Sequence, residues 1–181
     1  AAVMGMEPRQ ASADEIEAMK KLLGESIAEG AWGISFGLTY LPGVFAKREE
    51  LVSLCREAGV KKGICVFHIR SEGKGLIEAI REAIDVGRAS EAPVHISHLK
   101  ASGQKNWSKI DEAFQIIEQA RAEGLKVTAD AYPYTAGFAE LGVILPDKFY
   151  EDPDRISRFK DPKKRGLLLR NLRKHYTANP V

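Results

Sequence analysis

Histidine is the residue in this sequence best suited to metal chemistry, and two histidines stand near the ends of apolar segments. His68 lies in GICVFHIR, and His98 lies in PVHISHLKA, one repeat of 30 residues later. Side chains alternate between the two faces of a strand, so each histidine shares a face with the apolar residues two and four positions before it. If the segments are neighbouring parallel strands, ~4.8 Å apart, both imidazoles can bind one metal ion at ~2.1 Å. We therefore expect His68 and His98 to lie together.

A third histidine, His95, precedes His98 by three residues, and strand alternation gives it the opposite face. We expect it to point toward flanking helices and to serve packing. Two histidines alone do not make a strong metal site, because a catalytic zinc usually has three protein ligands and a water. Asp130, in the next predicted strand, is a candidate carboxylate ligand, and a role in orienting the ligands is the alternative.

Four mostly apolar segments recur at intervals of 32, 30 and 32 residues, which predicts strands buried on both faces. Helical patterns occupy the intervals. The first helix is predicted to begin with Ser12 and Glu15 in a capping-box pattern and to stop at Gly30. An alternation of helix and strand predicts parallel strands. The predicted strands start at Ala31, Gly63, Pro93 and Leu125.

The fold class predicted from this repeat is α/β, as a partial TIM-like (β/α)8 barrel with about four parallel strands and flanking helices. A unit of about 31 residues taken eight times gives about 250 residues, the usual size of such a barrel. A small open α/β sheet is the alternative, but the glycine-rich phosphate-binding motifs typical of that fold do not occur in the sequence. Residues 1–146 are assigned to the central β/α units, and residues 147–181, a loop and a basic helix, to a continuation of the same domain.

The composition is ordinary for a globular protein, with 44% hydrophobic residues, 29% charged residues and a net charge of +2. This charge is too small to indicate a nucleic-acid partner. No apolar run reaches the ~18 residues of a membrane span, and no signal peptide is visible. We therefore expect no nucleic-acid or membrane partner and a cytoplasmic location. Cys55 and Cys65 match no metal-ligand spacing, which favours two reduced and partly buried thiols.

Several motifs resemble those of the N-acyl-D-amino-acid deacylases (D-aminoacylases) of the amidohydrolase superfamily. VFHIRSEG, HISHLKASG and VTADAYPYTAG resemble three consecutive motifs, and GAWGISFGLTYLPG resembles the strand and loop before them. The similarity extends to about residue 146. It implies a TIM-like barrel with one or two zinc ions (Zn2+) at its mouth. By this resemblance, His68 and His98 match the metal-binding histidines of the fifth and sixth strands.

The same resemblance implies a substrate site and an activity. Tyr40, Lys100 and Tyr132 match positions that can meet the substrate carboxylate or the scissile carbonyl, and Arg70 is given a supporting role there. The implied activity is zinc-dependent hydrolysis of the amide of a small-molecule N-acyl-D-amino acid.

Parts of the family pattern do not occur in the sequence. The His-x-His of the first strand and the bridging ligand are expected before Ala1, and the aspartate that acts as general acid/base is expected after Val181. The sequence is therefore interpreted as a central fragment that is inactive alone. GISFGL also lacks the lysine that other amidohydrolases carboxylate as a metal bridge, which favours a deacylase over an enzyme of the hydantoinase type.

Two alternatives stay open. The chain could belong to an amidohydrolase that opens cyclic amides, as dihydroorotases and hydantoinases do. It could also be a non-catalytic half-barrel that assembles with itself or with a partner. A half-barrel has two open strand edges and an exposed interior, both of which favour association.

Overall fold

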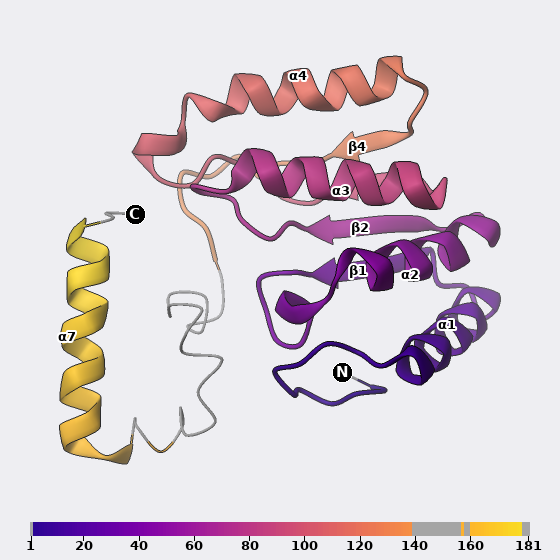
Figure 1. The fold of residues 1–181 in the computed structure, drawn as a ribbon. Coiled ribbons are helices and arrows are strands. Elements are labelled where there is room, and N and C mark those ends of the chain that lie inside the picture. The colour runs from indigo at the N-terminus through magenta and orange to yellow at the C-terminus, as the bar shows by residue number, and fades with distance from the viewer. Residues whose placement is uncertain (1, 139–156, 158–159, 179–181) are drawn as a thin grey trace. The chain divides into compact units, whose positions relative to one another are not determined.

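The computed structural model describes residues 2–138, 157 and 160–178. They divide between two compact units, Ala1–Pro133 and Tyr134–Val181. The first unit holds the sheet and its helices (Figure 1), and the second holds helix α7, Pro162–Ala178. The predicted domain boundary after residue 146 lies outside the described residues, and the division between the units falls earlier, after Pro133.

Helices and strands alternate along the first unit, as the sequence repeat predicts. Its strands are β1 (Gly33–Gly37), β2 (Ile64–His68), β3 (Val94–Ile96) and β4 (Val127–Ala129). Its α-helices are α1 (Ala13–Ala28), α2 (Arg48–Val60), α3 (Leu76–Ser90) and α4 (Lys109–Ala122), and two 3-10 turns, η1 (Gly43–Phe45) and η2 (Gln104–Asn106), lie in the loops.

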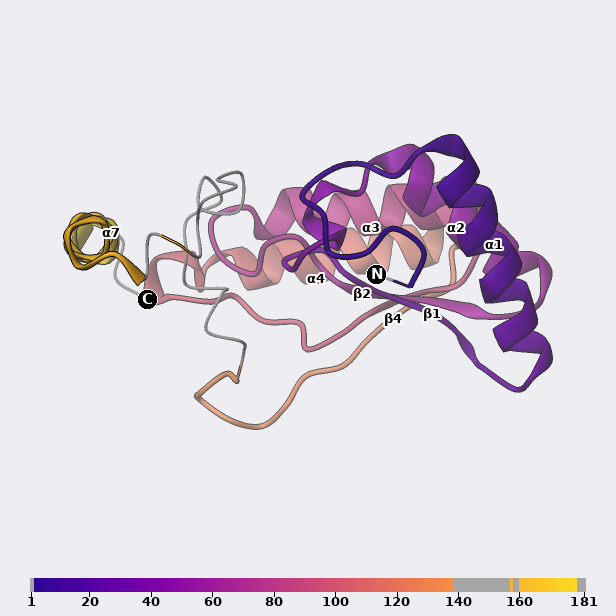
Figure 2. The ribbon, with the colours of Figure 1, turned by 90° about the horizontal axis from the view of Figure 1, so that it is seen from below.

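The strands form one parallel sheet in the order β1-β2-β3-β4. Helices α2, α3 and α4 lie side by side over one face of this sheet, and α1 packs beside α2 (Figures 1 and 2). Each strand is therefore the neighbour of the next one in sequence, with a helix in each connection. This is the arrangement of consecutive units in a (β/α)8 barrel, and it confirms the predicted α/β fold with parallel strands.

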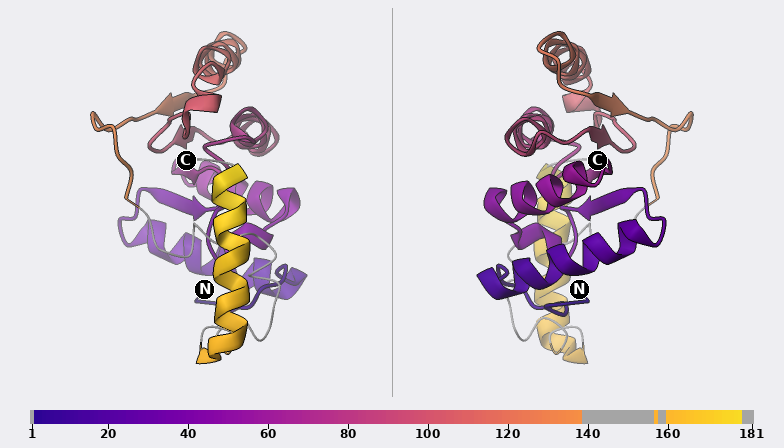
Figure 3. Two further views of the ribbon diagram at one scale, coloured as in Figure 1. Left: turned by 90° about the vertical axis from the view of Figure 1, so that its left-hand side faces the viewer. Right: turned by 90° about the vertical axis from the view of Figure 1, so that its right-hand side faces the viewer.

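The hydrophobic core lies between the sheet and the helices. Alternate strand residues point into it and pack against buried residues of the helices such as Leu51 and Ile80. The strand residues between them, including Val66 and His68, are only half-buried on the other face. In the part of the chain that the structure describes, helices cover one face of the sheet (Figure 3), so the prediction of strands buried on both faces is met on that face alone. The core residues of the last three strands are Cys65, Phe67, Val94, Ile96 and Val127.

Local signals in the sequence set the ends of the first helix as predicted. The Glu15 N–H donates to Ser12 Oγ at 3.2 Å, and the Ser12 N–H donates to Glu15 Oε2 at 2.8 Å, which completes the capping box. Gly30 follows the helix with a φ of 112°, a left-handed value that glycine adopts without steric cost. Cys55 and Cys65 are both free, as expected, and they are fully buried rather than partly buried.

None of the helices that the structure describes is long and apolar enough to cross a membrane.

Candidate metal centre

The two histidines singled out in the sequence meet at the carboxyl ends of β2 and β3. His68 Nδ1 lies 2.5 Å from His98 Nε2, and the ring centroids are 4.6 Å apart. The two nitrogens face each other at hydrogen-bonding distance. Two nitrogen ligands of a tetrahedral zinc ion lie ~3.4 Å apart, so the rings would have to separate by ~1 Å to bind one ion together. Among the residues that the structure describes, however, no group of three or more histidine, cysteine, aspartate or glutamate side chains is placed to hold a metal.

The geometry that brings these histidines together differs from the predicted one. Strand β3 ends at Ile96, so strand alternation does not extend to His98. His98 has a φ of 44°, in the left-handed region, and this turn directs its ring toward His68. The predicted proximity is therefore confirmed, whereas the reasoning from strand parity is wrong for His98.

The expectation for His95 is also wrong. In the sheet register His95 lies beside Val66 on one side and Thr128 on the other. Residues in register point to the same face, so His95 shares the uncovered face with Val66 and His68. Its neighbours Val94 and Ile96 are the residues that point into the helical layer, where both are fully buried.

Burial and neighbouring charge affect the ionisation of His68. Partial burial, and then repulsion from His98, lower the pKa of the His68 imidazole below its ordinary value. A lowered pKa favours the neutral imidazole, which is the form that binds a metal ion.

Glu72 is a charged member of this site that the sequence reasoning missed. Its Oε1 lies 2.8 Å from His98 Nδ1 and 2.6 Å from Lys100 Nζ. A carboxylate beside Nδ1 favours a proton on that nitrogen, which leaves the lone pair of Nε2 directed at His68. The Ser102 N–H donates to the Glu72 carbonyl oxygen at 2.7 Å and holds the loop after β2 against the loop after β3. The signal that could have found Glu72 was its place in the VFHIRSEG motif.

Asp130 contacts two of the three histidines near the strand ends, His95 and His98. Its Oδ1 accepts the backbone N–H of His98 at 2.5 Å, and its Oδ2 accepts His95 Nε2–H at 2.7 Å. The hydrogen bond with His95, followed by the one with the His98 backbone, lowers the pKa of the Asp130 carboxyl. Both Asp130 oxygens are thus occupied by hydrogen bonds, which favours the orienting alternative of the sequence analysis over direct metal ligation.

Of the four residues expected near the substrate, Lys100 and Tyr132 lie near the histidine pair, whereas Tyr40 lines a different cavity. The Lys100 ammonium lies 5.2 Å from the centre of the Tyr132 ring and donates to the His98 carbonyl oxygen at 2.9 Å. Lys100 and Tyr132 are thus brought to the histidine pair. Tyr40 follows β1 and lines a separate cavity of about 320 Å³ with Leu41 and Glu50.

Arg70 is engaged in contacts that differ from the expected ones. Its guanidinium forms an ion pair with Glu82 at 3.0 Å and donates to the carbonyl oxygens of Val44 at 2.7 Å and Ala46 at 2.9 Å. These contacts tie the η1 loop to α3. They favour a structural role for Arg70, and the predicted role with substrate gains no support from them.

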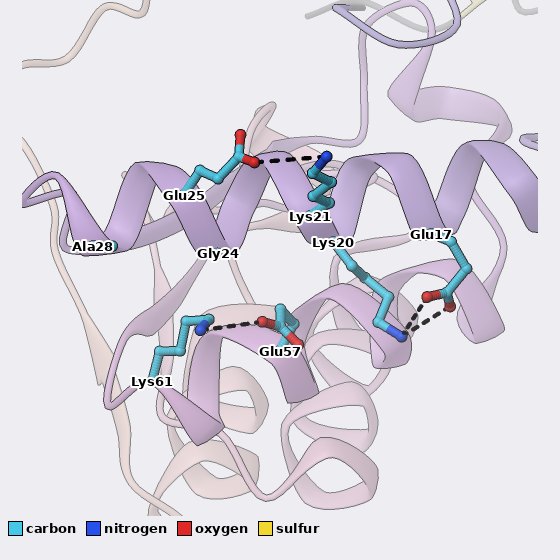
Figure 4. A pocket seen from close by; sticks show the side chains of 8 residues that line it. All are labelled: Glu17, Lys20, Lys21, Gly24, Glu25, Ala28, Glu57 and Lys61. Carbon is cyan, nitrogen blue, oxygen red and sulfur yellow. Dashed lines mark hydrogen bonds and ion pairs between the residues drawn. The ribbon is translucent and has the colours of Figure 1, made fainter.

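A larger, charged groove lies on the helical side of the first unit, between α1 and α2 (Figure 4). Its volume is about 520 Å³. Lysine–glutamate pairs line it, Lys20 with Glu17 at 2.8 Å and Lys61 with Glu57 at 3.7 Å. These residues belong to helices and not to strand ends, so the groove is distinct from the histidine site.

Comparisons with known proteins identify proteins that are similar to this chain. No family model matches it. It is 42% identical over 141 residues to a D-aminoacylase of Alcaligenes xylosoxydans xylosoxydans, a match that covers 78% of this chain and 29% of that protein. The chain thus spans less than a third of the length of this relative.

Solved structures point the same way. A D-aminoacylase structure that concerns a binuclear metal centre is 39% identical, with a TM-score of 0.73 over 80% of this chain and 31% of that one. The N-acyl-D-glutamate deacylase of Bordetella bronchiseptica, in complex with zinc and a phosphonate inhibitor, is 34% identical, with a TM-score of 0.72 over 74% of this chain and 28% of that one. Over the segment that these comparisons cover, the chain is similar to D-aminoacylase and the N-acyl-D-amino-acid deacylases, which are amidohydrolases.

Proposed function

We propose that this chain carries part of the zinc site and substrate site of an enzyme that hydrolyses the amide of N-acyl-D-amino acids. The observation that carries the proposal is the approach of His68 Nδ1 to His98 Nε2 at the carboxyl ends of adjacent parallel strands. Catalytic groups of a (β/α)8 barrel lie at this end of the strands. The relatives named for D-aminoacylase activity and for a metal centre support the same assignment.

The donor set fits zinc in its chemistry. Imidazole nitrogen is a preferred zinc ligand, and a carboxylate behind a ligand histidine is a common orienting partner. His68 and His98 would hold the ion, with Glu72 behind His98. When bound, zinc activates a water and polarises the amide carbonyl. The described residues place no third ligand beside these two histidines, so further zinc ligands would have to come from another part of the protein.

The residues around the histidines would bind and orient the substrate. Lys100 carries a positive charge that can pair with the α-carboxylate of an N-acyl-amino acid. In the structure this charge is paired with Glu72 and lies over the Tyr132 ring. A substrate carboxylate would therefore share or replace the Glu72 contact, and Tyr132 would limit where the ammonium can move.

A chimeric enzyme tests the proposal. The matching 141 residues of the Alcaligenes D-aminoacylase are replaced by those of this chain. Hydrolysis of N-acetyl-D-amino acids and bound zinc are then measured, with the L-enantiomers as controls. We expect the chimera to act on the D-substrates. His68→Ala and His98→Ala should each lower kcat/KM by about 10³-fold or more and lower the zinc content, because each removes a metal ligand.

Glu78→Gln is the matched control for these substitutions. Glu78 is an exposed residue of α3, and its replacement should leave both rate and zinc content within about twofold. Unchanged zinc content and rate in both histidine variants would refute the proposed site.

We further propose that the chain self-associates through its open strand edges. In the described structure, β1 and β4 each pair with a neighbour on one side only. Unpaired strand edges and an uncovered sheet face favour pairing with another chain. The mass of the chain in solution over a range of concentrations tests this proposal, and a monomer at every concentration would refute it.

A further inference from the structure

His95 lies beside the histidine pair, on the same face of the sheet, without forming part of the pair. Its register partners Val66 and Thr128 fix the face that it occupies. Its side chain is 22% exposed, so the ring is largely enclosed by its neighbours. The contacts of its two ring nitrogens show what the ring does there.

Both ring nitrogens of His95 are engaged by residues of β4 and the segment after it. Nε2 lies 2.7 Å from Asp130 Oδ2, and Nδ1 lies 2.8 Å from Thr128 Oγ1. Because a carboxylate oxygen only accepts, Nε2 carries the proton, and in the neutral ring Nδ1 accepts from the Thr128 hydroxyl. These two bonds fix the tautomer and the plane of the ring, and neither nitrogen is left for a metal ion.

The other oxygen of Asp130 holds the backbone of His98. Asp130 Oδ1 accepts the His98 N–H at 2.5 Å, while Oδ2 is held by His95. The Asp130 side chain is 57% exposed, so burial does not fix its orientation. The bond from His95 is therefore the contact that orients the carboxylate toward the His98 N–H.

The backbone of His98 needs such support. Its φ of 44° lies in a region that residues other than glycine adopt at a cost in free energy. This conformation turns the imidazole toward His68 after β3 has ended. A hydrogen bond from the N–H to a charged acceptor is stronger than a neutral one and favours this conformation over extended alternatives.

We propose that His95 is a positioning residue that acts through the Asp130 carboxylate to hold the backbone of His98 in the conformation that aims its imidazole at His68. This effect of His95 on the conformation of the His98 backbone does not depend on the proposed function. The consequence for zinc binding rests on that function.

Amide hydrogen exchange at His98, measured by NMR on the whole 181-residue chain, tests the hold directly. His95→Gln places an amide N–H near the position of Nε2 and should keep the exchange rate within about threefold of wild type. His95→Asn is also polar, but its shorter side chain does not reach Asp130. Exchange at His98 should then be about tenfold faster, which is the effect of losing one charge-assisted hydrogen bond.

A double-variant cycle tests the route through Asp130. Asp130→Ala alone should accelerate exchange at His98 about tenfold or more. Adding His95→Asn to Asp130→Ala should have no further effect, because the carboxylate that transmits the contact is absent. Additive effects, or equal exchange in the Gln and Asn variants, would overturn the inference. Urea unfolding of each variant separates a local change at His98 from a loss of global stability.

Zinc binding by the same variants, placed in the chimeric enzyme described above, provides the second measurement. If His68 and His98 bind zinc, His95→Asn should weaken zinc affinity about tenfold relative to His95→Gln, the usual effect of an outer partner of a ligand. A chimeric enzyme that takes no zinc at these histidines would refute the proposed function, and the exchange rates would still decide the role of His95. Zinc binding with exchange rates unaffected by His95→Asn would overturn this inference and leave the proposed function standing.

Discussion

Glu72 shows how one side chain can connect two residues with different proposed tasks. Its Oε1 contacts both the His98 ring and the Lys100 ammonium. The three side chains are between 24% and 29% exposed, so their charges interact in a partly desolvated environment. The carboxylate therefore affects both the metal ligand and the expected substrate contact.

Replacing this carboxylate by its neutral isostere should weaken zinc binding. Glu72→Gln keeps the shape of the side chain but removes the charge that favours a proton on His98 Nδ1. We expect about tenfold weaker zinc affinity in competition with a chelator. Glu78→Gln, on an exposed position of α3, is the control and should bind zinc as wild type does. Equal affinity in the Glu72→Gln and wild-type proteins would contradict the orienting role of Glu72.

Glu50, at the wall of the cavity beside β1, gives a prediction for pH dependence. Partial burial raises the pKa of the Glu50 carboxyl above its ordinary value of 4.5. The folded state then binds a proton at Glu50 more tightly than the unfolded state, so this group lowers stability as pH rises from 4.5 through its folded pKa. Glu50→Gln should raise the free energy of unfolding by about 0.5 kcal/mol at pH 7.5.

This gain should disappear at pH 3, where the carboxyl is protonated in both states. Urea unfolding at the two pH values measures it. Glu49→Gln, at the exposed neighbouring position, is the control and should bring no gain at either pH. A gain for Glu50→Gln that is equal at both pH values would contradict this explanation.

At the scale of elements, the Arg70 guanidinium connects three segments of the chain. It follows β2, pairs with Glu82 of α3, and donates to the carbonyl oxygens of Val44 and Ala46 around η1. A planar guanidinium can make several such bonds at once, whereas an ammonium cannot reproduce their geometry. Arg70 therefore fixes the loop that follows Tyr40 against the helical layer.

Arg70→Lys should accordingly lower the free energy of unfolding by about 2 kcal/mol, because at least two half-buried carbonyl groups lose their partner. Arg48→Lys is the matched control. Arg48 pairs with Asp85 of the same helix α3 at 2.6 Å, but both side chains are about half exposed. Loss of this exposed ion pair should lower the free energy of unfolding by less than about 0.5 kcal/mol. Equal losses in the two variants by urea denaturation would show that the loop contacts of Arg70 contribute nothing to stability.

At the scale of the whole molecule, the sheet edge at β1 is one of the two edges through which we propose that the chain self-associates. The Leu38 N–H donates to the His68 carbonyl oxygen, so strand alternation directs the Ser35 N–H away from β2. That N–H is available for pairing with a second chain. Ser35→Pro removes it and should shift sedimentation equilibrium toward the monomer.

Ser35→Thr retains the N–H and is the control for this edge variant. It should associate as strongly as wild type, because threonine fits strand geometry well. Equal association of the proline and threonine variants would show that the β1 edge takes no part in the contact.

The sequence by itself determined the alternation of helices and parallel strands and the proximity of His68 and His98. A repeat near 31 residues predicted parallel strands with helices between them, and the structure has this topology. The same repeat identified His68 and His98 as partners. Such features follow from hydrophobic periodicity, which is a local property of the chain.

Only the tertiary structure decided which groups face each other within the site. The left-handed turn at His98, the contacts of Glu72 with His98 and Lys100, and the link from His95 through Asp130 bring together segments about 30 residues apart. Strand parity fails as soon as a strand ends, and β3 ends two residues before His98. Periodicity carries no information on loop conformation or on contacts between loops. The direction of the side chains at the strand ends depends instead on contacts between the loops of neighbouring strands.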